Sequence, residues 1–220
     1  MNTVETNTTY KVVDMRNLTR DTFSVQIERN GMDFRAGQHV VLGIKGDYNT
    51  REYSIYSGEK DEHLEILVKA VDEGYLTHRL KKLQPGDKLD VFGPMGYFTI
   101  DPNKIQTHPF VFVASGTGIA PFKSFVRSYE DLDYTLLHGI KYGQETYDSE
   151  EYDPQRYISC TSRDDQGKFR GRVTDYLKQH DFAGNTLFYF CGNSEMIFDA
   201  MEVLKEKGFD REQMFAEVYF

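Results

Sequence analysis

The chain has 220 residues, 39% of them hydrophobic and 14% aromatic, and its 26 basic against 35 acidic residues give a formal net charge of −9. This apolar content is too high for a disordered protein. The acidic balance disfavours a general binder of nucleic acid or of anionic membranes, so we expect one or two globular domains with other partners.

Several classes of site are also disfavoured. Two cysteines, Cys160 and Cys191, are too few for a disulfide framework or for an iron–sulfur cluster, which takes about four. The six histidines lack the spacing of a metal site, so no metal is expected. The N-terminus does not resemble a signal peptide and no apolar stretch reaches about 18 residues, which favours a cytoplasmic protein. The acidic run 148–153 is typical of a solvated loop or helix end.

The first half of the chain reads as β structure. Alternating apolar residues between Gly and Pro turns predict five or six short strands, which favours a small antiparallel barrel. Leu76, Leu80 and Leu83 are spaced by four and three residues, and this predicts one helix within the barrel. The expected strands are 10–15, 22–28, 38–44, 53–56, 64–68 and 88–92.

The second half alternates strand and helix patterns. The break at Asp101-Pro102-Asn103 predicts a boundary between a first domain, residues 1–103, and a second, residues 104–220. Repeated strand–helix units are typical of a parallel sheet covered on both faces. The expected strands are 110–114, 134–138, 157–161, 186–191 and 214–218, and the expected helices are 122–129, 173–180 and 195–207.

The stretch Phe110–Pro121, FVFVASGTGIAP, is the most informative. A buried strand is followed by the small residues 115–118 and then by a helical pattern, a layout that offers backbone N–H groups to a phosphate. Pro121 stands where a dinucleotide fingerprint has its third Gly, so a nucleotide loop and an ordinary turn both stay open. Ligands of parallel sheets bind at the carboxyl ends of the strands. The strand ends expected to share this rim are 115–118, 139–141, 162–164 and 192–194.

Four short motifs follow one another along the chain, and their order is informative. Arg51-Glu52-Tyr53-Ser54 is followed by GTGIAP at 116–121, by Cys191-Gly192-Asn193 and by the terminal Glu217-Val218-Tyr219-Phe220. In this order the chain resembles the ferredoxin–NADP(H) reductase family, and within it the compact bacterial ferredoxin/flavodoxin reductases. The resemblance covers nearly the whole chain. It implies an FAD-binding antiparallel β-barrel domain followed by an NAD(P)-binding α/β domain with a parallel sheet.

The resemblance implies a set of FAD-binding residues. An Arg can clamp a pyrophosphate, a Tyr can lie against a flavin ring, and a helix N-terminus with a Thr hydroxyl suits a diphosphate. Without the resemblance, the same segments read as a strand with an Arg salt bridge and as a plain helix start. The residues implied for FAD are Arg51, Glu52, Tyr53, Ser54, Lys69, Val71, Gly74, Leu76, Thr77, Thr117, Tyr219 and Phe220.

The resemblance also implies a nucleotide set. Family members that use NADPH carry a Ser-Arg pair at this strand end and a second Arg before the next helix, which Ser162, Arg163 and Arg172 match. The run 171–175, GRVTD, also resembles NADH-using oxygenase reductases, and a solvated basic loop is the plain reading. The residues implied for NADP(H) are Gly116, Thr117, Gly118, Lys141, Ser162, Arg163, Arg172, Cys191, Gly192 and Asn193.

The activity implied is that of a flavin-dependent oxidoreductase. Hydride would pass between NADP(H) and FAD, and single electrons between FAD and ferredoxin or flavodoxin. Tyr219 would stack on the flavin, Phe220 would lie nearer the adenine, and Cys191 and Glu217 would lie near the nicotinamide, although the two terminal aromatics could divide these roles differently. The residues implied at the catalytic centre are Ser54, Cys191, Glu217 and Tyr219.

Three other functions stay open. They are an NADH-dependent reductase component for an oxygenase or cytochrome, a reductase subunit of a larger complex, and a non-catalytic nucleotide-binding module. An acidic redox partner would need a local basic patch on this acidic chain. The candidates for that patch are Arg79, Lys81, Lys82, Lys168 and Arg170.

Overall fold

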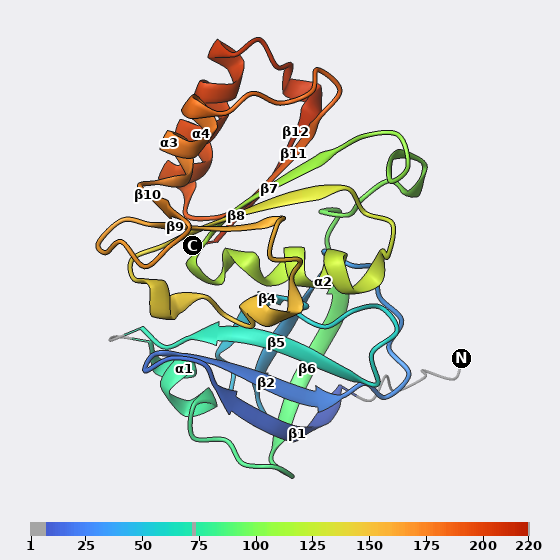
Figure 1. Cartoon of the computed structure of the whole chain (residues 1–220). Coiled ribbons are helices and arrows are strands. Elements are labelled where there is room, and N and C mark those ends of the chain that lie inside the picture. Colours follow the sequence, from blue (N-terminus) through green and yellow to red (C-terminus); the bar gives the residue numbers. More distant parts are fainter. Residues whose placement is uncertain (1–7, 72–73, 220) are drawn as a thin grey trace.

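The computed structural model describes residues 8–71 and 74–219, which form two six-stranded sheets one after the other along the chain (Figure 1). The first sheet is antiparallel, with strand order β4-β3-β6-β1-β2-β5. The second is parallel, with strand order β10-β9-β8-β7-β11-β12. The predicted combination of an antiparallel and a parallel sheet is therefore confirmed.

The antiparallel sheet curls into a barrel. A bridge between Ile55 and Ile66 brings the chain after its first edge strand onto its other edge strand. The inward side chains of the strands, among them Val25 and Ile27, are fully buried, as their alternation predicted. The strands are β1 (Thr9–Asn17), β2 (Thr22–Glu28), β3 (His39–Ile44), β4 (Thr50–Ser54), β5 (His63–Lys69) and β6 (Lys88–Met95).

One helix, α1 (Tyr75–Leu80), lies against the barrel (Figure 1). Leu76 and Leu80 are buried in the barrel core, as their spacing predicted. Leu83 is buried too, but it lies in the turn after the helix. The helix is short because Gly74 precedes it and a Pro85-Gly86 turn follows it.

The parallel sheet is covered by helices on both faces. Helices α3 and α4 pack on one face, and α2 lies on the other, between this sheet and the barrel (Figure 1). Strand β7 is buried on both faces, and the rings of Phe112 and Phe122 stack at 4.9 Å between centroids. The elements are β7 (Phe110–Ser115), α2 (Ala120–Ser128), β8 (Tyr134–Ile140), β9 (Tyr157–Thr161), β10 (Phe169–Arg170), α3 (Val173–Gln179), β11 (Leu187–Gly192), α4 (Ser194–Glu206) and β12 (Met214–Val218).

Short 3₁₀ turns fill the connections. The predicted domain boundary after residue 103 falls in one of them, between β6 and β7, and it stays a prediction. Strand β10 was not predicted, because two residues carry no periodicity. The turns are η1 (Pro102–Lys104), η2 (Gly116–Ile119), η3 (Gly143–Glu145), η4 (Ser149–Glu151) and η5 (Arg211–Gln213).

The acidic run 148–153 was predicted to be solvated, and for its first residue this is wrong. Asp148 is only 6% exposed. Its Oδ2 accepts hydrogen bonds from Lys123 Nζ at 2.7 Å, from Arg16 Nη2 at 2.9 Å and from the Tyr56 hydroxyl at 3.1 Å. These partners come from distant parts of the chain, so the run in isolation had no sign of them.

Lys123 joins the two sheets at this point. Its side chain is 2% exposed, and its Nζ also lies 3.6 Å from Glu65 Oε2 and 3.9 Å from the centroid of the Tyr56 ring. Arg16 Nη2 in turn donates to Glu65 Oε1 at 2.6 Å. We call Arg16, Glu65, Lys123 and Asp148 the buried ion cluster. It ties β1 and β5 of the barrel to α2 and to the loop after β8.

Candidate functional site

Three of the four side chains predicted for the catalytic centre form a hydrogen-bonded chain. Ser54, at the end of β4, donates from Oγ to Glu217 Oε2 at 2.9 Å, and the Tyr219 hydroxyl donates to Ser54 Oγ at 2.8 Å. The fourth, Cys191 on β11, has its side chain in hydrogen-bond contact with Tyr219. We call these four residues the serine–glutamate cluster. It joins residues more than 160 positions apart in the sequence.

Burial governs the ionisation of this cluster. Burial raises the pKa of Glu217, against the opposing effects of the Ser54 hydrogen bond and of His39, whose Nδ1 lies 3.6 Å from Glu217 Oε1. Burial also raises the pKa of Cys191 and of Tyr219 well above their ordinary values. Cys191 is therefore a neutral thiol rather than a nucleophilic thiolate. The cluster therefore holds one carboxyl group whose pKa is raised by burial, a feature typical of functional sites.

A cleft of about 670 Å³ opens next to this cluster, at the carboxyl ends of the parallel strands, where a ligand was predicted to bind. Tyr219 lines it from the side of the serine–glutamate cluster. Gly118 and Cys191 do not line the cleft, although both were predicted for NADP(H). The other predicted residues do line it: Gly116, Thr117, Lys141, Ser162, Arg163, Arg172, Gly192 and Asn193.

The glycines of this rim allow two loops to touch. A Cβ on Gly118 would lie 2.2 Å from the carbonyl oxygen of Cys191, and one on Gly192, whose φ is +125°, would lie 2.3 Å from Ser115 Oγ. Ser115 Oγ also accepts a hydrogen bond from the Asn193 N–H at 2.9 Å. The two loops thus pack backbone against backbone, which only residues without a side chain permit.

Two basic side chains that line the cleft have no polar partner in the described part of the chain and are available to an anion. Within the residues that the structure describes, the side chains of Lys141 and Arg163 make no hydrogen bond or ion pair. Lys168 is different, because its Nζ donates to the backbone carbonyls of Pro154 and Tyr157. Partnerless cations in a cleft are suited to phosphate groups.

The barrel side of the site shows an unused polar atom. The hydroxyl of Tyr53 is buried and has no hydrogen-bond partner among the described residues, and burial raises its pKa to about 12. Arg51 is exposed and its guanidinium donates only to the carbonyl of Thr50, at 2.8 Å. Glu52 beside it is exposed too. A buried donor without a protein partner is able to bond a polar group of a ligand.

The start of α1 is built around Gly74. A Cβ there would lie 2.4 Å from Thr77 Oγ1, which donates to the Gly74 carbonyl at 3.2 Å and accepts from the Val71 N–H at 3.4 Å. Lys69 and Val71 line the cleft. The side chain of Leu76 faces the barrel core, so any contact with a cofactor would come from its backbone. Phe220, predicted to contact FAD, lies outside the described residues.

These barrel residues fit FAD. The exposed Arg51 guanidinium, which makes no ion pair among the described residues, suits a diphosphate, and the orphan Tyr53 hydroxyl is available to a ligand. Metal does not enter this arrangement: over 8–71 and 74–219 no group of three or more His, Cys, Asp or Glu side chains is placed to hold an ion. Within the same residues, no helix is long and apolar enough to span a bilayer.

Comparison with known proteins gives the family. Residues 9–100 match the family of oxidoreductase FAD-binding domains, and residues 112–202 match that of oxidoreductase NAD-binding domains. A flavodoxin/ferredoxin–NADP reductase from Rhodobacter capsulatus is 30% identical over 231 residues, which cover 90% of this chain and 85% of that protein. The chain belongs to the ferredoxin–NADP reductase family. It is an FAD- and NAD(P)-binding oxidoreductase, as its motifs predicted.

Solved structures share the fold of this reductase. A ferredoxin NADP+ reductase from Neisseria gonorrhoeae, crystallised with FAD and NADP, matches with a TM-score of 0.86 at 23% identity, over 97% of this chain and 98% of that one. A cytochrome P450 reductase from Amycolatopsis matches with a TM-score of 0.84 at 24% identity, over 96% of this chain and 68% of that one.

Reductase components of oxygenases are also similar. The toluate 1,2-dioxygenase electron transfer component of Pseudomonas putida is 24% identical over 94% of this chain and 66% of its own length. A propane 2-monooxygenase reductase component from Mycolicibacterium smegmatis is 27% identical over 91% of this chain and 64% of its own length. The chain spans slightly less than two thirds of these relatives.

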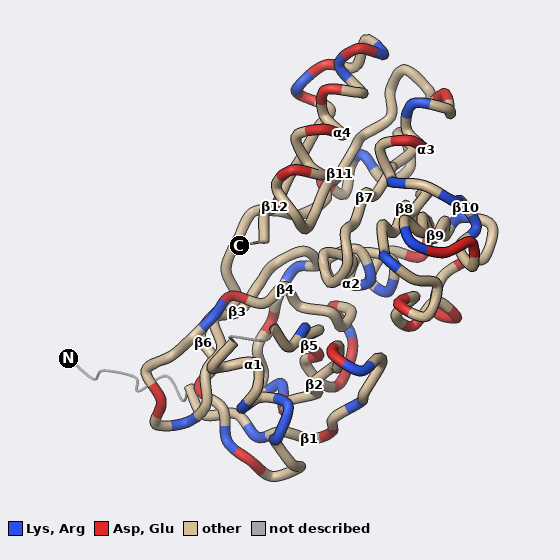
Figure 2. The backbone as a smooth tube through the Cα atoms, turned by 90° about the vertical axis from the view of Figure 1, so that its left-hand side faces the viewer, with Lys and Arg blue, Asp and Glu red and all other residues tan. Residues whose placement is uncertain are grey.

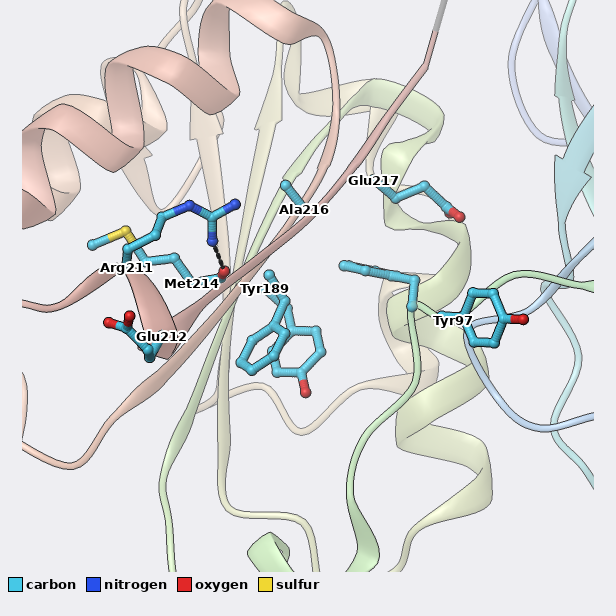
Figure 3. Close-up of a pocket in the computed structure, with 9 residues that line it drawn as sticks. Tyr97, Tyr189, Arg211, Glu212, Met214, Ala216 and Glu217 are labelled. Atoms are coloured by element: carbon cyan, nitrogen blue, oxygen red, sulfur yellow. Dashed lines mark hydrogen bonds between the residues drawn. The ribbon is translucent and has the colours of Figure 1, made fainter.

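A second hollow, of about 460 Å³, lies along β12 (Figure 3). Glu217 and Tyr97 stand at one end of it, and Arg211 and Glu212 at the other. Glu217 therefore lines this hollow while Tyr219 lines the nucleotide cleft. The serine–glutamate cluster of the reductase is reached from two sides.

The sequence analysis missed two histidines of this site. His39 lies beside Glu217, and His138 on β8 is fully buried behind the loop at 115–118. Neither belongs to a motif. His138 could have been suspected because it is a polar residue inside an otherwise apolar strand, YTLLHGI.

Proposed function

We propose that this reductase transfers hydride between NADPH and bound FAD and exchanges single electrons with a small redox protein, ferredoxin or flavodoxin. The observation that supports it most is that Tyr219, hydrogen-bonded through Ser54 to Glu217, lines the same cleft as Lys141 and Arg163, cations that are unpaired among the described residues. When bound, FAD supplies the redox chemistry of the family. The chain supplies binding, orientation and proton placement.

The barrel would hold the flavin. Arg51 and the start of α1 at Gly74 and Thr77 would bind the diphosphate. Tyr53 would lie against the ring system and use its orphan hydroxyl there. Glu52, Lys69, Val71 and Leu76 would complete the contacts on this side, with Thr117 and Tyr219 on the other.

The parallel sheet would hold the nucleotide. Arg163, Ser162, Arg172 and Lys141 would bind its phosphate-bearing adenosine end, since they line the outer cleft. The loops at 116–118 and 192–193 would enclose the nicotinamide end.

The four residues of the serine–glutamate cluster would then act at the reacting end. The Tyr219 ring lies at the cleft wall and would give way to the nicotinamide. Ser54 and Glu217 would orient the reacting groups and hold a proton at the Glu217 carboxyl, while the neutral Cys191 thiol packs behind.

The anaerobic absorbance spectrum of the purified protein tests this proposal. Flavin bands that bleach when NADPH is added support it. Protein that stays colourless after incubation with FAD would leave only a nucleotide-binding module.

The preference for NADPH is the finer part of the proposal. We expect Arg163→Ala to lower kcat/KM for NADPH by about 10- to 100-fold, the value of one charge-assisted hydrogen bond, and to leave NADH unchanged. A wild-type enzyme that prefers NADH, or an equal loss with both nucleotides, would favour the second candidate function, an NADH-dependent oxygenase or cytochrome reductase.

The similarity to oxygenase reductases supports that second candidate. The run 171–175 does so less than its sequence indicated. Its Asp175 carboxylate accepts a hydrogen bond from the Arg172 N–H at 2.9 Å and thus begins α3. This run therefore has a structural reason that does not depend on the nucleotide.

The proposal of ferredoxin or flavodoxin as redox partner is supported by the family more than by the charges on the protein surface. Acidic and basic residues are interspersed along the backbone (Figure 2). In the predicted basic patch, Arg79 pairs with Asp47, Lys81 donates to the carbonyl of Arg20 and Lys168 is held by carbonyls. Ferredoxin affinity measured against ionic strength tests whether charge steers this partner. The cytoplasmic location also stays a prediction.

A further inference from the structure

His138 lies directly behind the nucleotide loop. It sits on β8 with no exposed surface, and each of its ring nitrogens has one partner. Nδ1 lies 2.8 Å from the hydroxyl of Tyr157, and Nε2 lies 2.9 Å from the carbonyl oxygen of Gly116. The proposed function gives this histidine no task, because it does not line the cleft.

The two partners determine where the ring carries its proton. A backbone carbonyl can only accept, so Nε2 must carry the hydrogen that it donates to Gly116. Nδ1 is then free to accept, and the Tyr157 hydroxyl donates to it. Burial lowers the pKa of His138 to about 4, so the ring is neutral near pH 7. Tyr157, His138 and Gly116 thus form a chain of hydrogen bonds with one direction.

The hydrogen bond from His138 fixes the orientation of the peptide that follows Gly116. Gly116 is the first residue of the turn η2, its φ is +53°, and a Cβ there would meet nothing within 4 Å, so the space on that side of the residue is open. A glycine can rotate the following peptide at little cost. Because a trans peptide is planar, its C=O and the next N–H point in opposite directions. When the Gly116 carbonyl points inward at His138, the Thr117 N–H must point the other way, toward the cleft that Thr117 lines.

We propose that His138 is a positioning residue, which holds the Gly116–Thr117 peptide so that the Thr117 N–H is presented to the nicotinamide-proximal half of a bound nucleotide. The hydrogen bond from His138 to Gly116 depends only on the protein, whereas its role in nucleotide binding rests on the proposed function. Tyr157 acts one step further back, by keeping the donor proton of His138 on Nε2.

The hold can be tested in the FAD-loaded protein without nucleotide. Long-range ¹H–¹⁵N spectra of ¹⁵N-histidine-labelled protein should show the Nε2–H tautomer for His138, and a neutral Nδ1–H form would overturn the proposal. Amide hydrogen exchange at 116–119 should speed up at least tenfold in His138→Leu and hardly at all in Leu137→Val. Leu137 lies next to His138 on the opposite face of β8, so it controls for lost packing. Equal acceleration in both variants would also overturn the proposal.

Measurements of nucleotide affinity test the role of the His138–Gly116 hydrogen bond in binding. We expect His138→Leu to weaken NADP+ binding about five- to tenfold and to leave 2′,5′-ADP within twofold, since that fragment reaches only the adenosine end. His138→Gln, which keeps a side-chain donor, should recover part of the loss, and Tyr157→Phe should fall in between. Equal weakening of both ligands would make the role purely structural and would contradict the proposal.

These outcomes separate the two levels of the inference. If the wild-type protein binds neither ligand, the proposed function fails, while the tautomer and the exchange rates still decide whether His138 holds the loop. If His138→Leu does not fold, His138→Gln and Tyr157→Phe allow the same comparison of NADP+ with 2′,5′-ADP.

Discussion

The buried ion cluster and the serine–glutamate cluster both join the barrel to the parallel sheet, and they differ in how their charges are matched. In the ion cluster, the hydrogen bond to Asp148 raises the pKa of Arg16. Burial alone would raise the pKa of Asp148, but the hydrogen bonds from Arg16 and Lys123 outweigh it and lower that pKa strongly. Arg16 and Asp148 therefore stay charged at neutral pH.

In the serine–glutamate cluster, the effect of burial on the carboxyl pKa outweighs the effect of its hydrogen bonds. Burial raises the pKa of Glu217, and no Lys or Arg forms an ion pair with it among the described residues. Its neighbours Ser54, Tyr219 and Cys191 are neutral groups. Complete pairing is typical of a structural join, whereas an incompletely matched carboxyl in a cleft is typical of chemistry. Between the same two sheets, one cluster thus has paired charges and the other has a carboxyl group without a cationic Lys or Arg partner among the described residues, as expected for the reactive centre that we propose.

The largest effect is expected from Lys123→Met. Removing Lys123 leaves the buried Asp148 and Glu65 carboxylates with Arg16 as their one cationic partner among the described residues, and costs about 3–5 kcal/mol of unfolding free energy. Urea unfolding followed by circular dichroism measures it. Arg127→Ala is the control, because Arg127 forms exposed ion pairs with Asp61 and Glu151, worth about 1 kcal/mol or less. Equal losses in the two variants would contradict the distinction between buried and exposed ion pairs.

The next effect is expected from Ser54→Ala. Loss of the hydroxyl between Glu217 and Tyr219 should slow flavin reduction by NADPH about 100-fold, the usual result of a misplaced reacting group, with little change in stability. Stopped-flow absorbance measures the rate. Ser124→Ala removes a buried hydroxyl of α2 that has no hydrogen-bond partner among the described residues, and the rate of flavin reduction should be unchanged. A comparable slowing in Ser124→Ala would remove any special role of Ser54.

A smaller effect is expected from acid. The pKa of Asp148 is lower in the folded than in the unfolded chain, so its contribution is complete above the unfolded value of about 4 and is lost as the pH falls below it. The unfolding free energy should fall by roughly 2 kcal/mol between pH 5 and pH 2 on this account. In Asp148→Asn the fall should be less steep, although that variant is less stable throughout. An unchanged slope would contradict the role of Asp148.

The smallest effect is expected from Glu217→Gln, and it has the opposite sign. A carboxyl whose pKa is raised by folding costs stability once the pH exceeds its unfolded value, and a glutamine avoids that cost. The Tm should rise by roughly 1–3 °C at pH 8 and stay the same at pH 4, while turnover falls. A lower Tm at pH 8 would show that the glutamate charge is satisfied after all.

The sequence predicted the fold well because most strands and helices have a local pattern of apolar residues bounded by turn residues. Strands β2, β9 and β12 were predicted with the bounds that the structure shows, since their apolar runs end at clear turns. The four residues of the serine–glutamate cluster were predicted as a set through motifs of a known family, and their catalytic role stays a prediction. Spacing alone left each motif with an ordinary structural reading.

What the sequence could not predict depends on partners far along the chain. Asp148 looked solvated because its partner Arg16 is 132 positions away. His138 and His39 belong to no motif, and their roles follow from which strands lie side by side. The glycines at 118 and 192 were read as ligand contacts, whereas the structure shows that they also let two loops meet.

That contact between loops has a practical consequence for redesign. Because the loop after β7 and the loop after β11 interlock through Ser115, Gly118 and Gly192, neither can be exchanged alone. A chimaera that imports only one of them from a relative, with a side chain in place of Gly118 or Gly192, would put its Cβ less than 3 Å from the other loop. Efforts to change coenzyme choice by grafting should therefore move both segments as one unit.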